Sequence, residues 1–465
     1  MRSLAIVGGL FFASLSWAND VTLPDYERVV LDNGAVLLLA AKHDVPLVGM
    51  RAVVRGGSVA DPAEKAGLAD LLASVLQKGA GNRDAAEFAE AAASVGGNIS
   101  ASADVETVEI SAEFLSRDID LMIELVADML MRPTLAEDEV NKERDRAIAL
   151  IAAAKDSNLS GLMPSYTNAF IFGEHPFGNP TFGSESTLAA ITGDDVVQYH
   201  ADNFGGDRLI VAVAGDFQID ALKARLTTVF GAWEPAATPL PEIPAPDRAL
   251  PGRVLLVDKP GAAQTYFRIG NVGVAVDYPR RAELNLANTV FGGRFTSMLM
   301  TELRVKSGLT YGASSRVARH SEAGAVTIRS YTETAKTVEA IDMAIDILGR
   351  LHDRGLNDEM IESARNYIMG QFPPSLETAS SLAGMFAFLE EHELDRTYID
   401  DYGAKLAEAT PVSVSNAIAD VYPQTDDLVF VLIGDADEIR EAVAKYGEVT
   451  EIAITEPRFK PLPSD

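Results

Sequence analysis

A repeated pattern of strands and helices runs through both halves of the chain and constrains the fold more than any other feature. Residues 108–148 and 326–368 each begin with an apolar strand-like segment and continue into two helical segments. Each half also closes on an apolar run that stops at Gly-Asp, at 209–217 and at 428–436. The repetition predicts the duplication of one α/β unit, with two unrelated α/β domains as the alternative.

Paired strand segments between the helical segments indicate the kind of sheet. Residues 28–41 form two strand-like runs around an Asp-Asn-Gly turn, and another run follows at 48–57. We therefore predict an α+β fold of two homologous α/β domains, each a mixed, mostly antiparallel sheet with helices packed on one face. The stretch 234–252 contains six prolines and predicts a linker, which places the two domains at 22–233 and 253–457.

Composition and charge exclude several classes of site. With 68 acidic against 39 basic residues, the formal net charge is −29, which disfavours binding to nucleic acid. The absence of cysteine excludes disulfides, thiolate metal sites and cysteine nucleophiles. Residues 1–18 have a basic start, an apolar stretch and a small-residue end, which is typical of a signal peptide cleaved near Ala18. We expect a periplasmic protein without a membrane span in the mature chain; a retained anchor is the alternative.

Four segments of the chain, in a fixed order, carry a family resemblance. They are an opening Leu-Asp-Asn-Gly followed by a helix that runs into Lys-Gly, "FGEHPFGNPTFG" at 172–183, the closing strand at 209–217, and "FGGRFTSMLMTELRVKSGLTYG" at 291–312. Together they resemble the pitrilysin/insulinase family of zinc peptidases, in the short two-domain form related to mitochondrial processing peptidase. The resemblance covers nearly the whole mature chain and implies a peptidase fold of two homologous domains.

In active members of that family, a helix of the first domain carries the inverted zinc motif His-x-x-Glu-His. The corresponding positions of this chain hold Asp70, Ala73 and Ser74. The family's third ligand, a glutamate on a later helix, falls on Ala149 or Leu150. No two of the six histidines lie within five residues of each other, so no helix offers a His pair to zinc. We therefore expect no metal in this chain and zinc on a partner subunit.

The second half retains side chains that family members contribute across the cleft. Arg304 and Tyr311 match an arginine and a tyrosine that donate hydrogen bonds to the scissile carbonyl as it gains negative charge. A structural role is the alternative for each of these features. Arg304 and Tyr311 would then be a surface ion pair beside a half-buried ring. The glycines at 292–293 would be a turn at a helix start, and the strand around Asn98 would be an ordinary sheet edge. The substrate-binding positions that the resemblance implies are Gly292, Gly293, Phe295 and Asn98.

The expected function follows from the contrast between the two halves. We expect the non-zinc-binding subunit of a periplasmic heterodimeric zinc metallopeptidase, inactive alone, which supplies substrate-binding and carbonyl-stabilising residues. Its sister chain, with an intact His-x-x-Glu-His motif, would hydrolyse unfolded or extended peptides. The alternative is a catalytically silent peptide-binding or scaffold protein of the same fold. Glu143 and the acidic run 388–395 are expected to face solvent.

Overall fold

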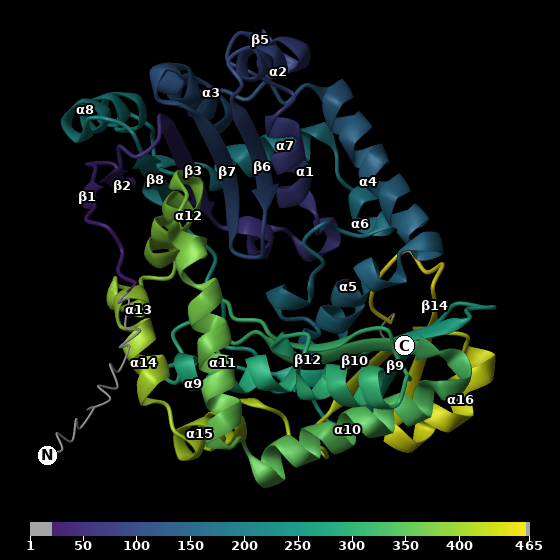
Figure 1. Cartoon of the computed structure of the whole chain (residues 1–465). Helices are drawn as coiled ribbons and strands as arrows, with labels where there is room; N and C mark the ends of the chain where they lie inside the picture. The colour runs from purple at the N-terminus through teal and green to yellow at the C-terminus, as the bar shows by residue number, and fades with distance from the viewer. Residues whose placement is uncertain (1–20, 462–465) are drawn as a thin grey trace, which may run out of the picture.

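Two six-stranded sheets, one in each half of the chain, form the framework of the molecule (Figure 1). The computed structural model describes residues 21–461, so the expected signal peptide at 1–18 lies outside the described residues. The first sheet has the strand order β1-β2-β8-β3-β7-β6. Its strands are β1 (Glu27–Val30), β2 (Val36–Ala41), β3 (Leu47–Arg55), β6 (Asn98–Ala103), β7 (Thr107–Leu115) and β8 (Leu209–Gly215).

The second sheet, with the order β11-β12-β10-β13-β9-β14, repeats the topology of the first. In each sheet one central pair is parallel, β2 with β8 and β9 with β13, and the strands beyond it pair antiparallel. Only the outer strands differ, because β1 is antiparallel to β2 whereas β14 is parallel to β9. The strands of the second sheet are β9 (Arg253–Asp258), β10 (Gln264–Val272), β11 (Ala313–Val317), β12 (Ala325–Glu333), β13 (Val429–Gly434) and β14 (Glu448–Ala453).

Helices make up about 49% of the chain and strands about 20%. This confirms the predicted α+β class with mixed, mostly antiparallel sheets. The first half contains α1 (Leu68–Leu76), α2 (Ala85–Ala93), α3 (Ile119–Met131), α4 (Glu137–Ser157), α5 (Leu159–Phe172), α6 (Glu185–Ala189), α7 (Gly193–Asn203) and α8 (Ile219–Phe230), with the short strands β4 (Gly79–Ala80) and β5 (Arg83–Asp84). The second half contains α9 (Arg281–Asn288), α10 (Thr337–Arg354), α11 (Asp358–Gln371), α12 (Ala379–Glu391), α13 (Thr397–Asp400), α14 (Tyr402–Glu408), α15 (Pro411–Val421) and α16 (Ala436–Val443).

The central strands of both sheets are buried on both faces. In β8, Val211 and Val213 belong to the core that contains α1 and α3, whereas Ile210 and Ala212 belong to a separate core with α12. Successive side chains of a strand point to opposite faces, so a strand covered on both sides has a continuous apolar sequence. This arrangement explains why β8 and β13 lack the alternation of apolar and polar residues that marks a half-exposed strand.

The two halves exchange one helix each. Helix α12 packs along β3 and β8 of the first sheet, and α5 packs on β10 and β13 of the second sheet (Figure 1). The approach of α12 is close at Gly49 on β3, where an added Cβ would lie 2.6 Å from the backbone of Ser380. On the same helix, the ring of the buried Phe386 lies 4.6 Å from the ring of Tyr26. Each sheet is therefore completed by a helix from the other half, which the sequence analysis did not anticipate.

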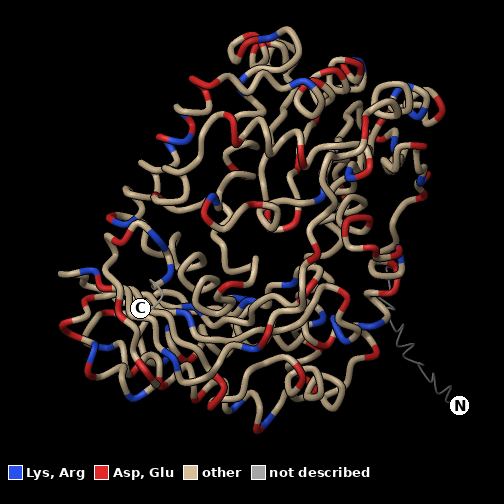
Figure 2. Tube along the Cα trace, turned by 180° about the vertical axis from the view of Figure 1, so that it is seen from behind, with Lys and Arg blue, Asp and Glu red and all other residues tan. Residues whose placement is uncertain are grey.

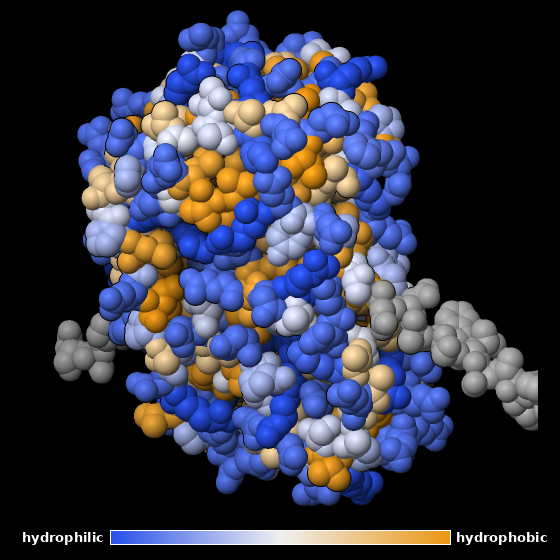
Figure 3. Space-filling model, turned by 90° about the vertical axis from the view of Figure 1, so that its left-hand side faces the viewer, coloured by the Kyte–Doolittle hydropathy of each residue, from blue (hydrophilic) through white to orange (hydrophobic). Residues whose placement is uncertain are grey.

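The outer surface is mixed in character. Figure 3 shows one side of the molecule, on which hydrophobic patches lie among hydrophilic residues. One hydrophobic side chain on the outer strand β1, Val30, is 54% exposed. The proline-rich stretch 234–252 contains neither helix nor strand. Among the helices of residues 21–461, none combines the length and the apolar character needed to cross a membrane.

Candidate functional site

Helix α1 packs against β6, β7 and α4, and a carboxylate holds its first turn. Asp61 accepts hydrogen bonds from the backbone N–H groups of Gly67 at 2.8 Å, Leu68 at 3.1 Å and Ala69 at 3.0 Å. These are N–H groups that a helix leaves without an internal partner. Burial raises the pKa of Asp61 to about 8, although the three N–H donors act in the opposite direction. The start of α1 is thus fixed to the loop after β3.

The positions of α1 that correspond to the zinc motif carry no suitable set of ligands. Ala73 is 1% exposed and its side chain has no donor atom. Asp70 and Ser74 are half-buried, and burial raises the pKa of Asp70 to about 6, which disfavours the ionised form that binds metal. Ala149 and Leu150 on α4 are exposed. Within residues 21–461, no group of three or more His, Cys, Asp or Glu side chains is arranged to hold a metal ion.

Glu143 on α4 is buried, so the prediction that it faces solvent was wrong. Its side chain is 8% exposed, and its Oε1 lies 3.0 Å from Nζ of Lys78. Its Oε2 lies 3.4 Å from Nη1 of Arg146, one turn further along α4. Lys78 lies two residues after the end of α1, so this ion pair joins the segment after α1 to α4. Helical spacing alone does not show that a lysine from another segment lies beside Glu143.

Arg304, in the π-helical segment η7 (Met300–Lys306), and Tyr311, in the loop that follows η7, lie side by side in the second half. The guanidinium carbon of Arg304 is 4.3 Å from the centre of the Tyr311 ring and 4.9 Å from that of Phe295. Tyr311 is 72% exposed and Phe295 is 63% exposed, so two surface rings hold the guanidinium by cation–π contacts. Neither Arg304 nor Tyr311 forms a side-chain hydrogen bond or ion pair within the described part of the chain. Their donors are available to a bound molecule.

The remaining expected substrate positions lie in different settings. Gly292, in the π-helical segment η6 (Thr289–Gly293), is buried, and an added Cβ would lie 2.3 Å from the backbone nitrogen of Ser315. This glycine permits close packing on β11, which is a structural role. Gly293, beside it, is exposed. Asn98 begins β6, the outer strand of the first sheet, and pairs only on its inner side, with Glu113 of β7.

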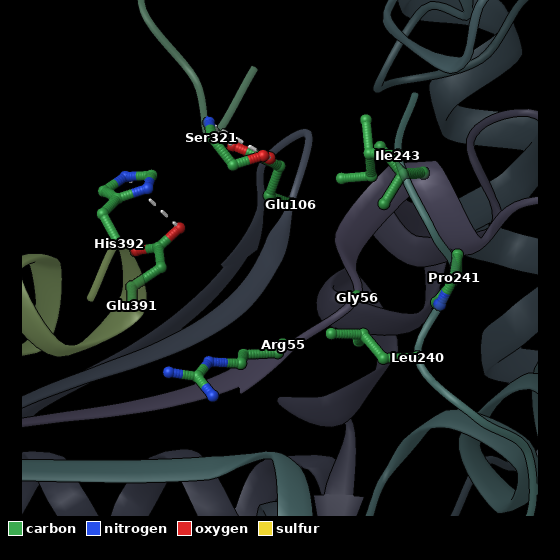
Figure 4. A pocket seen from close by; sticks show the side chains of 10 residues that line it. Arg55, Gly56, Glu106, Leu240, Pro241, Ile243, Ser321, Glu391 and His392 are labelled. Atoms are coloured by element: carbon green, nitrogen blue, oxygen red, sulfur yellow. Dashed lines mark hydrogen bonds and ion pairs between the residues drawn. The ribbon is translucent and has the colours of Figure 1, made fainter. Parts of the chain in front are cut away.

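A cluster of acidic and histidine side chains joins the two halves of the molecule (Figure 4). Glu106, in the turn between β6 and β7, accepts a hydrogen bond of 2.9 Å from the backbone N–H of Ser321. Glu391 and His392 lie at the end of α12, with side chains 19% and 8% exposed. Burial, and to a smaller extent the neighbouring carboxylates, raises the pKa of Glu391 to about 8. The prediction that the run 388–395 faces solvent was therefore wrong for Glu391 and His392, because the exchanged helix carries its end into the contact between the halves, whereas Glu393 and Asp395 are exposed.

Two family models match the chain in succession. The model described as "Insulinase (Peptidase family M16)" matches residues 36–185, and the model described as "Peptidase M16 inactive domain" matches residues 190–368. The chain belongs to the insulinase family, peptidase family M16. The family resemblance deduced from the sequence motifs is thereby confirmed. The strand order that the two sheets share is part of the M16 fold.

Several M16 proteins are similar over most of this chain. "Uncharacterized zinc protease YmxG" of Bacillus subtilis is 26% identical over 362 residues, which are 76% of this chain and 85% of the relative. The structure of a "peptidase M16 inactive domain" from Pseudomonas fluorescens has a TM-score of 0.82 at 21% identity, covering 88% of this chain and 98% of its own. The "periplasmic protease PqqL" of Escherichia coli has a TM-score of 0.75 at 14% identity, covering 93% of this chain but only 49% of PqqL.

The name of the Bacillus M16 relative describes a zinc protease, but the side chains of this chain do not provide a zinc site. Asp70 and Ser74 are the only motif positions on α1 with an oxygen-bearing side chain, since Ala73 has none. Leu150 is apolar, as is Ala149 beside it. A catalytic zinc site keeps three protein ligands, so these two oxygens are too few. In the second half of this M16 chain, by contrast, the donors of Arg304 and Tyr311 are left without a hydrogen-bond or ion-pair partner among residues 21–461.

Proposed function

We propose that this M16 chain is the non-zinc-binding subunit of a periplasmic two-chain zinc metallopeptidase. Alone it is inactive. Its partner is a homologous chain with an intact His-x-x-Glu-His motif, and the pair hydrolyses unfolded or extended peptides. In the pair, Arg304 and Tyr311 of this chain donate hydrogen bonds to the scissile carbonyl oxygen of a peptide bound on the sister chain.

The observation that carries the proposal is the exposed pair Arg304 and Tyr311. A guanidinium and a phenol are both good donors to an oxygen that gains negative charge, and donors already in position cost no reorganisation during the reaction. The rings of Phe295 and Tyr311 hold Arg304 in one place, and its donors have no partner among residues 21–461. A scaffold protein has no need of such an arrangement.

The size of the chain supports a second chain in the active assembly. The similarity covers 93% of this chain but only 49% of PqqL, which is described as a periplasmic protease. Two chains of this length together match the length of that protease. We propose that the units 22–233 and 253–457 of this chain form one half of such an assembly, with the linker 234–252 between them.

An extended peptide has a natural place on the first sheet. The outer edge of β6, which begins at Asn98, is not paired with another strand of the described residues, and peptides bind such edges through their backbone. Phe295 is exposed beside Arg304, and Gly293 is exposed two residues earlier in the chain, so both are suited to contact the same peptide from the second half. The buried Gly292 is better explained by its packing on β11.

The proposed location is the periplasm. It is supported by the signal-like pattern of residues 1–18 with its small-residue end near Ala18, and by the likeness to a protease described as periplasmic. N-terminal sequencing of the protein from a periplasmic extract tests this part: we expect a mature chain that begins near Asn19.

The catalytic role is tested in a pair reconstituted from this chain and a zinc-bearing sister, found by co-purification and mass spectrometry. Tyr311→Phe removes the hydroxyl and keeps the ring, so we expect kcat for a neutral unstructured peptide to fall roughly a hundredfold to a thousandfold, the usual loss for one such donor. Arg304→Ala should lower kcat similarly and also raise KM.

Matched controls separate catalysis from folding. Tyr367→Phe on α11 and Arg354→Ala at the end of α10 change the same residue types at exposed places away from Tyr311 and should leave kcat/KM unchanged. Gel filtration should show that all four variants still form the pair. If Tyr311→Phe and Arg304→Ala both leave kcat/KM of an active pair intact, the chain is a silent binding or scaffold subunit instead.

A further inference from the structure

Three arginines lie on neighbouring strands of the second sheet. Arg268 on β10 pairs directly with Arg329 on β12, and Arg329 pairs with Ser314 on β11. Arg316 lies two residues further along β11, opposite Thr327. All three alternate with residues of the core that contains α10, so they share the opposite face of the sheet, toward the first half. Figure 2 shows basic residues on the strands of the lower, C-terminal half where they face the upper half.

This arginine triad, Arg268, Arg316 and Arg329, is unfavourable for the folded chain by itself. Like charges directly opposite each other on adjacent strands repel. Burial and the charges of Arg329 and Arg316 lower the pKa of Arg268 to about 10. The chain has 68 acidic residues, yet none of those within 21–461 forms an ion pair with the triad. The one side-chain contact is a hydrogen bond of 2.6 Å from Nε of Arg329 to Oγ of Ser314.

Two members of the triad border a groove that is open to the space between the halves, whereas Arg316 lines a separate pocket together with Asp104, Glu106, Glu109 and Glu391. The groove has a volume of about 390 Å³, and both Arg268 and Arg329 line it. Two tyrosine rings, Tyr266 and Tyr331, stack 5.3 Å apart on the same face. Ser160 at the start of α5 lines the groove from the first half. The groove thus combines aromatic surface for a peptide chain with two guanidinium groups that form no ion pair with a carboxylate of residues 21–461.

We propose that Arg268 and Arg329 of the triad form a binding site for carboxylates of a peptide, so that the chain selects extended peptides with acidic residues. A guanidinium presents paired N–H donors in the geometry of a carboxylate, and such charge-assisted pairs are the strongest hydrogen bonds in proteins. A peptide carboxylate supplies the counter-charge that the fold itself leaves out. The overall charge of −29 repels acidic peptides at long range, so the local triad is what makes their binding possible.

The position of the groove relates this inference to the proposed function, on which it rests. Gly312 lines the groove, and Tyr311 is the residue before it. A peptide whose carbonyl oxygen reaches Tyr311 therefore has neighbouring residues within reach of the groove. The arginines at the groove determine which residues of the substrate are preferred, while Arg304 and Tyr311 act on the scissile peptide bond.

The test measures binding of fluorescent peptides to the full mature chain by anisotropy. Three unstructured peptides differ only at a central pair, which is Glu-Glu, Gln-Gln or Lys-Lys. A hydrogen bond to a charged group contributes about 1.5–3 kcal/mol, so the Glu-Glu peptide should bind the wild type at least about tenfold more tightly than the Gln-Gln peptide. Amidated and free C-termini are compared in parallel, which shows whether side-chain or terminal carboxylates are bound.

The double variant Arg268→Gln/Arg329→Gln should lose the preference for the Glu-Glu peptide, while Arg354→Gln keeps it. Because the triad is repulsive in the free chain, the double variant should melt at the same or a higher temperature than the wild type; a merely structural triad would lower it. Equal affinity for the Glu-Glu and Gln-Gln peptides, or an unchanged preference in the double variant, overturns the inference. The proposed function is judged separately, because the Tyr311→Phe assay uses a neutral peptide.

Discussion

The two halves of the molecule share one strand order but place opposite kinds of residue on it. Between β3 and β6 of the first half lies α1, whose motif positions are an alanine, a serine and an aspartate with a raised pKa. Between β10 and β11 of the second half lies η7, followed by the exposed Tyr311. One segment is packed into the core, and the other presents donors to solvent. The common topology fixes where each segment lies, and the side chains decide whether its polar groups are buried or exposed.

The difference also shows how a site is lost without loss of the fold. Polar ligands that lie in a core require partners or a metal, because unpaired buried polar groups are costly. Ala73 has no such requirement, and α1 keeps its contacts with α4 and β6. The first half can therefore lack zinc ligands and still form the surface against which the second half packs.

The largest expected effect concerns metal content. The purified chain should contain no stoichiometric zinc by elemental analysis, because Ala73 and Leu150 offer no ligand and Asp70 and Ser74 are too few. Asp70→His/Ser74→His places two histidines one turn apart on α1, and its zinc affinity should rise above that of the wild type. One tightly bound zinc per wild-type chain that disappears in Asp70→Ala would contradict the contrast between the halves.

The next effect concerns the exchanged helices. Phe386→Ala removes a buried ring that joins α12 to the first half, so the free energy of unfolding should fall by about 3–5 kcal/mol. Urea denaturation measures it. The exposed Val412 serves as a control, since Val412→Ala should change the value by less than about 0.5 kcal/mol. If Phe386→Ala behaves like Val412→Ala, the first half does not depend on α12.

A smaller effect is expected from pH at the contact between the halves. Glu391 faces a mixed set of charged groups, namely Asp104, Glu106, Glu109, Arg55, His320 and His392. Its pKa is about 8 in the folded chain and near its ordinary value of 4.5 when unfolded. Between these values the folded state holds a proton that the unfolded state has lost, so stability falls as pH rises, by up to about 1.4 kcal/mol per pKa unit.

Glu391→Gln removes this proton, so its melting temperature relative to the wild type should increase as pH rises from about 5 to about 8. The lowered pKa values of His320 and His392 have the opposite sign, since they reduce stability as pH falls, and they remain in both proteins. The difference between variant and wild type therefore reports Glu391 itself. A difference that does not change with pH would show that Glu391 is ionised in the folded chain.

The smallest effect concerns the ring that positions Arg304. Phe295→Leu keeps an apolar side chain and removes one cation–π contact, worth about 0.5–1 kcal/mol at an exposed site. In the reconstituted pair, kcat/KM should fall about twofold to fivefold, with stability unchanged. A fall as large as that of Tyr311→Phe would mean that Phe295 contributes far more than its one contact with Arg304.

Much of the fold could be predicted because short patterns of apolar and turn-forming residues indicate its strands and helices. The runs at 209–217 and 428–436 predict buried strands, and β8 and β13 lie there, each ending at a glycine. The exchange of α5 and α12 could not be predicted, since helical periodicity identifies an apolar face but not the sheet that covers it. The division into 22–233 and 253–457 stays a prediction, and the exchange shows that packing crosses it.

The candidate site was accessible from the sequence only in part. Family motifs indicated Arg304 and Tyr311, and their spacing within one segment brings them together. The pair of Arg268 and Arg329 was missed, because they meet only through the register between β10 and β12. The burial of Glu143 and Glu391 was missed for the same reason: their partners come from distant segments, and acidic residues alone predict a solvated surface.

The exchange of helices has a consequence for the order in which the chain is made. The first sheet emerges complete in its strands once β8 has been synthesised, but the face that carries Ile210 and Ala212 stays bare until α12 follows. During that interval a large apolar face is open to other chains, which is a period of risk for aggregation. For the same reason, a cut in the linker 234–252 of the finished protein would not release two independent lobes, because α12 and α5 still join each half to the sheet of the other.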